Sequence, residues 1–203
     1  MKLVLATNNP AKVKEINSFF ASYGITVISP ADFGLSISPK ETGKTFHENA
    51  KIKAVETLDY LKEHGITDHI VLADDSGLEI QALENELGVD SALFMGESTP
   101  YLIRNKAILD RLQDIPPKSR GCRFVCVIAA AYPDGKVFFA EGEVTGIVAD
   151  KIMGENGFGY DPIFFLPEFN KTMAELTDKE KESVSHRGNA LRALISKFLC
   201  FSR

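Results

Sequence analysis

The stretch KLVLATNNPAKVKEINSFFASYGITVIS, residues 2–29, indicates how the fold begins. Its first five residues form a short apolar run that ends in turn-forming residues, which predicts a buried strand. Pro10 suits the first turn of a helix, and apolar residues then recur at helical spacing until Gly24. ITVIS, residues 25–29, predicts a second strand. A strand, a helix and a strand in succession favour parallel pairing of the two strands.

Beyond this opening, the sequence alternates between helical spacing and β-rich runs. Residues 123–150 predict a β-hairpin that turns at residues 133–135, Pro-Asp-Gly. Further strands are expected in IVLADDSGLEI, residues 70–80, with a break at residues 74–77, and at the end of GFGYDPIFF, residues 157–165, after a Gly-rich loop. Helices are expected at residues 45–64, 99–113, 174–182 and 185–199, and irregular chain at residues 30–43 and 84–97.

These elements combine into an α/β fold in which helices flank a long mixed β-sheet that bends into two lobes. With 203 residues, of which 44% are hydrophobic and 25% charged, the chain is typical of a globular protein. We expect a single domain over residues 1–203.

Charge and hydropathy exclude several partners. The net charge of −5 argues against nucleic acid and against an acidic membrane surface. No apolar stretch approaches the roughly 18 residues of a membrane span, and the N-terminal apolar run is too short for a signal peptide. A cytoplasmic location is therefore expected. Three cysteines without C-x-x-C spacing argue against a disulfide frame or a zinc site, and Cys122 and Cys126 fit buried thiols.

GKT, residues 43–45, matches only the end of a phosphate-binding P-loop. The full motif needs a glycine at the position of Ser38 and a buried strand directly before it, and both are missing. Thr45 and Glu48 instead have the spacing of a capping box at a helix N-terminus.

Two segments in the first half of the chain could bind phosphates and a metal. TNNPAK, residues 7–12, lies where the first helix begins, so free N–H groups, polar side chains and Lys12 could hold phosphate; plain capping by Asn8 or Asn9 is the alternative. Asp74 and Asp75 follow a buried strand and would converge only if the strand ended there. Hard oxygen ligands suit Mg²⁺, whereas a simple Asp-Ser-Gly turn is the alternative.

Two later segments could bind a base and an anion. GFGYD, residues 157–161, presents an aromatic ring and a carboxylate on a flexible loop, which suits a nucleotide base, although a glycine-loosened turn with buried aromatic residues explains it too. SHRG, residues 185–188, puts His186 and Arg187 in the first turn of a helix capped by Ser185. Cations there oppose the helix dipole, which favours an anionic or polar ligand.

Six blocks in this order resemble the inosine/xanthosine triphosphate pyrophosphatases, which hydrolyse non-canonical purine nucleoside triphosphates. The resemblance covers about residues 3–195 and rests on TNNPAK, ETG-x-TF-x-ENA-x-x-KA, ADDSGL, GFGYDPIF, AEL-x-x-x-x-K and SHRG. It implies two α/β lobes with a central active-site cleft, a homodimer, and Mg²⁺-dependent cleavage of a nucleoside triphosphate into monophosphate and pyrophosphate.

The resemblance also implies a role for each site residue. Asp75 would be the general base and a metal ligand, with Glu41 as its acidic partner, although Glu48 fits that position equally well. Lys53 would act in catalysis by contacting the triphosphate. Phe158 would stack on the base, with Asp161, His186 and Arg187 at its edge. The remaining expected substrate contacts are Thr7, Asn8, Asn9, Pro10, Ala11, Lys12, Ser76, Gly159, Tyr160 and Lys181.

One loop departs from the family pattern. Where the family has an aromatic residue and an arginine, this chain has Asp90 and Leu93. The missing positive charge favours weaker binding or a shifted substrate range. Two alternatives follow, a nucleotide-binding sensor without catalysis and a pyrophosphatase for other modified nucleotides.

Overall fold

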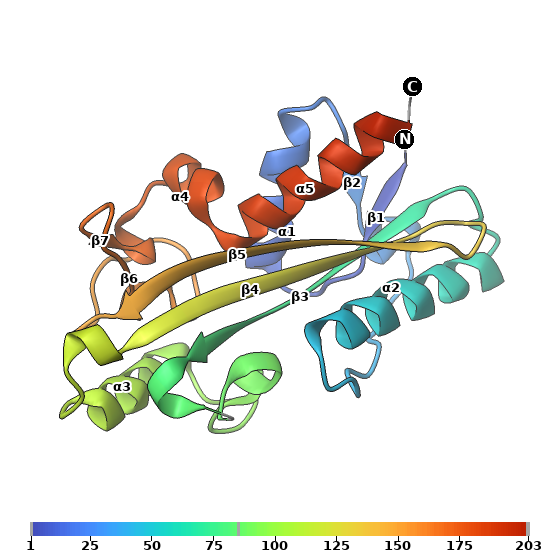
Figure 1. Cartoon of the computed structure of the whole chain (residues 1–203). Coiled ribbons are helices and arrows are strands. Elements are labelled where there is room, and N and C mark those ends of the chain that lie inside the picture. Colours follow the sequence, from blue (N-terminus) through green and yellow to red (C-terminus); the bar gives the residue numbers. More distant parts are fainter. Residues whose placement is uncertain (1, 85, 202–203) are drawn as a thin grey trace. The chain divides into compact units, whose positions relative to one another are not determined.

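The protein is described by a computed structural model that covers residues 2–84 and 86–201, with side chains up to residue 198. In this part of the chain, seven strands form one sheet in the order β2-β1-β3-β4-β5-β6-β7 (Figure 1). The strands are β1 (Leu3–Leu5), β2 (Val27–Ile28), β3 (Ile70–Ile80), β4 (Gly121–Ala131), β5 (Val137–Val148), β6 (Phe164–Leu166) and β7 (Lys171–Thr172). The helices are α1 (Pro10–Ala21), α2 (Phe46–Glu63), α3 (Tyr101–Leu112), α4 (Asp178–Val184) and α5 (His186–Phe201).

The sheet is mixed, as the sequence predicts. β1 pairs in parallel with β2 and β3, which confirms the parallel opening. β6 pairs antiparallel with β5 and β7, and the predicted hairpin joins β4 to β5 through a turn closed by hydrogen bonds between Tyr132 and Lys136 and between Gly135 and Tyr132. The expected α/β fold with a mixed sheet flanked by helices is therefore confirmed.

The chain forms two compact units. The first comprises the described residues up to Asp75, Cys126–Gly142 and those from Asn189 onward. The second comprises Ser76–Val125 and Glu143–Gly188. The chain crosses from the first unit to the second inside β3, between Asp75 and Ser76.

The first unit packs helices on both faces of its strands, with α1 and α5 on one face and α2 on the other (Figure 1). Leu3 and Leu5 of β1 point to the same face because they are two residues apart. They join Phe19 and Phe20 of α1 and Leu194 of α5 in one buried cluster. On the opposite face, α2 buries residues that recur at helical spacing, namely Ala50, Ala54, Leu58 and Leu61.

The second unit has its own buried cluster. Ile108 and Leu112 of α3 contribute to it, together with Phe124 of β4 and Phe164 of β6. The rings of Phe124 and Phe164 stack with centroids 4.4 Å apart. Contacts within this cluster hold α3 and β6 together, and they anchor the loops next to these two elements.

Three expectations about local structure need correction. The break predicted at residues 74–77 is wrong, because β3 continues through them to Ile80. The helix predicted at residues 174–182 begins only at Asp178, after a 3-10 turn over Met173–Glu175. Residues 84–97, expected to be irregular, contain a 3-10 helix at Gly88–Leu93, while Asn85 lies outside the described residues.

Several other features agree with the sequence, although residues 30–43, expected to be irregular, begin with a 3-10 helix at Pro30–Phe33. Cys122 and Cys126 are buried free thiols, and the side chain of Cys200 lies outside the described part. The expected Thr45–Glu48 capping box opens α2. Among the described residues, no helix is long and apolar enough to cross a lipid bilayer.

Candidate active site

Asp74 and Asp75 lie side by side in β3, and each meets a different lysine. Neighbouring side chains in a strand point to opposite faces. Asp74 Oδ2 lies 2.9 Å from Nζ of Lys12 on α1. Asp75 Oδ1 lies 3.0 Å from Nζ of Lys53 on α2. The two carboxylates thus form separate ion pairs, and they do not converge in a turn.

Lys53 lies between two carboxylates, because its Nζ is also 3.3 Å from Oε1 of Glu41. Glu48, the alternative acidic partner, is engaged elsewhere. Its Oε2 accepts hydrogen bonds from the backbone N–H groups of Lys44, at 2.6 Å, and Thr45, at 3.2 Å. The structure therefore places Glu41, rather than Glu48, beside the lysine that binds Asp75.

The carboxyl group of Asp75 has a raised pKa. Burial raises the pKa of Asp75 to about 6, Glu41 adds to the rise, and Lys53 opposes it. The pKa of Lys53 is also raised, because attraction to its carboxylates outweighs the burial that lowers it. A carboxyl group with a pKa of about 6 is mostly ionised at neutral pH and is still basic enough to accept a proton.

Asp75 also has unused hydrogen-bonding capacity. Its Oδ2 is buried and has no hydrogen-bond partner in the protein. The described residues hold no cluster of three or more His, Cys, Asp or Glu side chains that could enclose a metal ion. Two carboxylates such as Asp75 and Glu41 nevertheless fit Mg²⁺, since this ion keeps several waters and completes its shell with phosphate oxygens.

The start of α1 combines capping with a cation. Oδ1 of Asn9 accepts from the backbone N–H groups of Ala11, at 3.0 Å, and Lys12, at 3.4 Å, so Asn9 is the helix cap. Oγ1 of Thr7 accepts from Asn9 N at 3.2 Å, and Pro10 occupies the first turn. The capping interpretation therefore holds for Asn9. Thr7 and Lys12 are half-buried, whereas Asn8, Asn9 and Pro10 are exposed.

In the second unit, Asp161 organises the glycine-rich loop. Its Oδ2 lies 2.6 Å from Lys181 Nζ and accepts from Phe158 N at 2.7 Å. Gly157 has φ of +74°, and a Cβ there would lie 2.2 Å from the same carboxylate oxygen. Only glycine therefore fits this position, which lets the carboxylate approach the backbone.

Two cations flank the half-buried Phe158 ring. Lys181 Nζ lies 4.7 Å from the ring centroid and the Arg187 guanidinium carbon lies 5.7 Å from it. Arg187 also donates from Nη2 to Ser76 Oγ at 3.0 Å. His186 stacks on the ring of Phe124 with centroids 4.7 Å apart. Ser76, Phe158, Asp161, Lys181 and Arg187 therefore form one connected group.

The next two residues of the loop are held by contacts outside it. Gly159 O accepts from Nδ2 of Asn105 on α3 at 3.1 Å. The Tyr160 hydroxyl donates to Ser91 O at 2.6 Å, and burial raises the pKa of Tyr160 to about 12. Tyr160 is thus a buried neutral phenol that anchors the loop.

Sequence reasoning missed two contributors to these clusters. It did not foresee that Asp74 pairs with Lys12, because residues 62 positions apart in the chain carry no local signal for contact. It also missed Arg104, a buried side chain on α3 that donates to the backbone oxygens of Ala92, Gly96 and Glu97. Arg104 holds the loop that departs from the family pattern, and Leu93 in that loop is 53% exposed.

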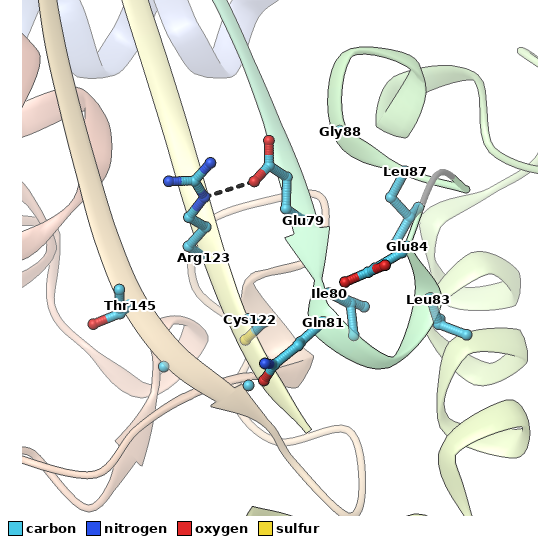
Figure 2. A pocket seen from close by; sticks show the side chains of 12 residues that line it. Glu79, Ile80, Gln81, Leu83, Glu84, Leu87, Gly88, Cys122, Arg123 and Thr145 are labelled. Atoms are coloured by element: carbon cyan, nitrogen blue, oxygen red, sulfur yellow. Dashed lines mark hydrogen bonds and ion pairs between the residues drawn. The ribbon is translucent and has the colours of Figure 1, made fainter. Parts of the chain in front are cut away.

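A separate pocket of about 640 Å³ lies at the ends of β3, β4 and β5 (Figure 2). Arg123 spans it, with Nε 2.6 Å from Glu79 Oε2 and Nη1 3.1 Å from Glu143 Oε2. The described residues that line this pocket include none of the predicted site residues. These cross-strand ion pairs account for Glu79 and Arg123, two of the charged residues that line the pocket.

Comparison with known proteins finds relatives that match nearly the whole chain. Residues 3–197 match the Ham1 family. A dITP/XTP pyrophosphatase of Thermus thermophilus is 46% identical over 198 residues, covering 98% of this chain and 92% of that protein. One of Clostridium perfringens is 42% identical over 193 residues, covering 95% of both. The solved Staphylococcus aureus Ham1 protein is 37% identical and superposes with a TM-score of 0.84 over the whole of both chains.

Proposed function

The chain belongs to the Ham1 family, and we propose that it hydrolyses non-canonical purine nucleoside triphosphates, namely ITP, dITP and XTP, to the monophosphate and pyrophosphate. The observation that carries this proposal is Asp75. It is a buried carboxylate beside a charged lysine, with a pKa of about 6 and one oxygen without a partner. The relatives named as dITP/XTP pyrophosphatases support the substrate class.

In the proposed reaction, water attacks the α-phosphorus. Asp75 accepts the proton of the water as the new P–O bond forms, and the bond from the α-phosphorus to the bridging oxygen breaks to release pyrophosphate. Lys53 and Lys12 stabilise the negative charge that grows on the phosphoryl oxygens and on the departing group. No covalent intermediate on the protein is required.

We assign Mg²⁺ to Asp75 and Glu41, because the unpartnered oxygen of Asp75 and the second carboxylate suit a hard cation. When bound, the ion would neutralise phosphate charge and polarise the phosphoryl oxygens. Thr7, the N-terminus of α1 and Lys12 would hold the phosphate chain, with Asn9 keeping the helix end in place.

We assign the purine base of the substrate to the connected group in the second unit, which contains Phe158 and Arg187. Phe158 would stack on the purine, and its two flanking cations help to hold the ring in place as a platform. Arg187 and His186 would read the edge of the base, with Ser76, Gly159, Tyr160, Asp161 and Lys181 shaping the site. Adenine has an amino group where these purines have oxygen, so a donor in the site would be left unpaired, which costs a few kcal/mol.

We propose a cytoplasmic homodimer that removes non-canonical nucleotides from the nucleotide pool. The substrate is a small molecule, and neither nucleic acid nor membrane is needed as a partner. The chain's net charge of −5 suits a local cationic site rather than an extended basic surface.

A substrate panel tests the proposal. Purified protein is incubated with Mg²⁺ and separately with the triphosphates of inosine, xanthosine, adenosine, guanosine and thymidine, and both pyrophosphate and monophosphate are assayed. We expect release from ITP and XTP at least about 100-fold above that from ATP. Equal release from ATP would contradict the base assignment. ITP binding without release would identify a sensor.

A further inference from the structure

Phe158 lies between two glycines that take backbone conformations closed to most residues. Gly157 has φ of +74° and Gly159 has φ of +66°. Glycines on both sides make the ring easy to reorient, because each has access to conformations of either hand. The position of the ring therefore depends on the contacts that hold the backbone around it.

One such contact comes from each side of the ring. Before it, Phe158 N donates to Asp161 Oδ2 at 2.7 Å, a bond within the loop itself. After it, Gly159 O accepts from Asn105 Nδ2 at 3.1 Å. Asn105 belongs to α3, whose Ile108 and Leu112 lie in the buried cluster of the second unit. Asn105 thus ties the backbone that follows the ring to a packed helix.

The surroundings of Gly159 strengthen this link. A Cβ on Gly159 would lie 3.7 Å from the ring of Tyr101, which opens α3. Tyr101 in turn packs edge-on against Tyr160, with ring centroids 5.1 Å apart. The first turns of α3 therefore contact both residues that follow Phe158.

The chemistry of Asn105 argues against a packing role alone. Its side chain is buried, with 2% of the residue exposed, and its Oδ1 has no hydrogen-bond partner. A buried amide with an unused oxygen destabilises a core that an apolar side chain would fill. The hydrogen bond that Nδ2 donates to Gly159 O explains why an amide occupies this buried position.

The neighbouring residue acts on another loop. Arg104 donates to the backbone of Ala92, Gly96 and Glu97. Successive residues of α3 therefore hold two different loops, and Asn105 is the one bonded to the loop that carries Phe158.

We infer that Asn105 is a positioning residue that fixes the Phe158 ring for stacking on the purine base. It acts through Gly159 O, touches no substrate, and leaves the Asp75 chemistry alone. This inference rests on the proposed function for its kinetic test, but the ring position can be measured independently of activity.

The kinetic test uses Asn105→Leu, which keeps side-chain size and removes the donor. We expect the KM for ITP to rise about tenfold, the worth of one buried hydrogen bond, with kcat within about twofold of the parent. Inhibition by inorganic tripolyphosphate, which has no base, should not change. If Asn105→Leu folds poorly, Asn105→Ser replaces it. Serine is too short to reach Gly159 O, so this variant should show the same rise in KM. Ile108→Val, a buried change on the same helix, controls for general destabilisation and should leave KM unchanged.

The independent test exploits the absence of tryptophan from the sequence. Phe158→Trp introduces a single tryptophan at the ring position, and its fluorescence can be excited selectively over that of the tyrosines. Adding Asn105→Leu to this protein should lower the tryptophan anisotropy without any nucleotide, while adding Ile108→Val should not. Unchanged anisotropy and unchanged KM in folded Asn105 variants would overturn the inference. An anisotropy change in a protein that hydrolyses no triphosphate would instead retain the positioning role and refute the proposed function.

Discussion

The two units each bury a lysine–aspartate pair, and the pairs differ in what surrounds the carboxylate. Asp75 and Lys53 lie 3.0 Å apart in the first unit, and Asp161 and Lys181 lie 2.6 Å apart in the second. Asp75 stands on a regular strand and keeps one oxygen without a partner. Oδ2 of Asp161 binds both Lys181 and the backbone N–H of Phe158.

This difference separates chemistry from positioning. An ionisable group that is buried, near neutral in pKa and not fully hydrogen-bonded can accept a metal or a proton. A carboxylate that ties a lysine to a loop backbone holds geometry in place. We therefore propose that the same two residue types serve two roles in this protein, and that the surroundings of each carboxylate decide which one.

The largest expected effect separates Asp75 from its neighbour in the strand. Asp75→Asn should lower pyrophosphate release from ITP by about 10³-fold, because the amide cannot accept the proton of the water. Asp74→Asn, whose carboxylate forms its ion pair with Lys12, should lower it far less, because the proton acceptor Asp75 is kept. Circular dichroism checks that both variants are folded. Equal losses in the two variants would break the distinction between the faces of β3.

The second pair should respond in binding and stability. Asp161→Asn takes a buried carboxylate from Lys181 and loosens the Phe158 backbone, so we expect about 3 kcal/mol lower stability and a KM for ITP raised at least tenfold. Urea unfolding and steady-state kinetics measure the two effects. The control is Asp150→Asn in the same unit. Asp150 also pairs with a cation, Arg120, but its side chain is 76% exposed, so we expect little change in stability or KM. A parental KM for Asp161→Asn would remove its positioning role.

A smaller effect is expected for the ring itself. Phe158→Leu keeps an apolar side chain but removes the aromatic face, which should cost about 1–3 kcal/mol of binding and raise the KM for ITP by about 5- to 150-fold. The change should appear in KM rather than in kcat. If KM for ITP stays constant while kcat falls, the ring is not the purine platform.

An effect of similar size concerns the pH dependence of stability in the absence of metal. The pKa of Asp75 lies at about 6 in the folded protein, above its ordinary value of 3.8, so the folded state binds the proton more tightly. The free energy of unfolding should therefore fall as pH rises from about 4 to 6, by about 2 kcal/mol from this group. Urea unfolding in EDTA, compared between the parent and Asp75→Asn, isolates the contribution. A difference between the two that does not vary over this range would contradict the raised pKa.

Much of this architecture was predictable because it is encoded locally. Apolar spacing predicts the helices, and Pro-Asp-Gly predicts the hairpin between β4 and β5. The late start of α4 also had a local signal, because Thr177 and Glu180 form a capping box with the usual three-residue spacing. The prediction at residues 174–182 overlooked it.

The continuity of β3 was not predictable in the same way. Asp-Asp-Ser-Gly has the composition of a turn, yet β3 lies between β1 and β4 in the sheet, and lysines on both faces neutralise its two aspartates. Long-range contacts therefore override the local preference. The same holds for the hydrogen bond between Asn105 and Gly159, which lie 54 residues apart in the chain. The individual site residues were predicted from the resemblance to a family and not from local patterns.

The most direct test compares the two aspartates at the chemical step. Single-turnover hydrolysis of ITP is measured with enzyme in excess, Mg²⁺ present and concentrations raised to saturation, for Asp75→Asn and Asp161→Asn. We predict that Asp75→Asn remains slower than the parent by about 10³-fold at saturation, while Asp161→Asn recovers to within a few-fold of the parent. Parental rates at saturation for Asp75→Asn, or an equally deep loss for Asp161→Asn, would contradict the division between chemistry and positioning.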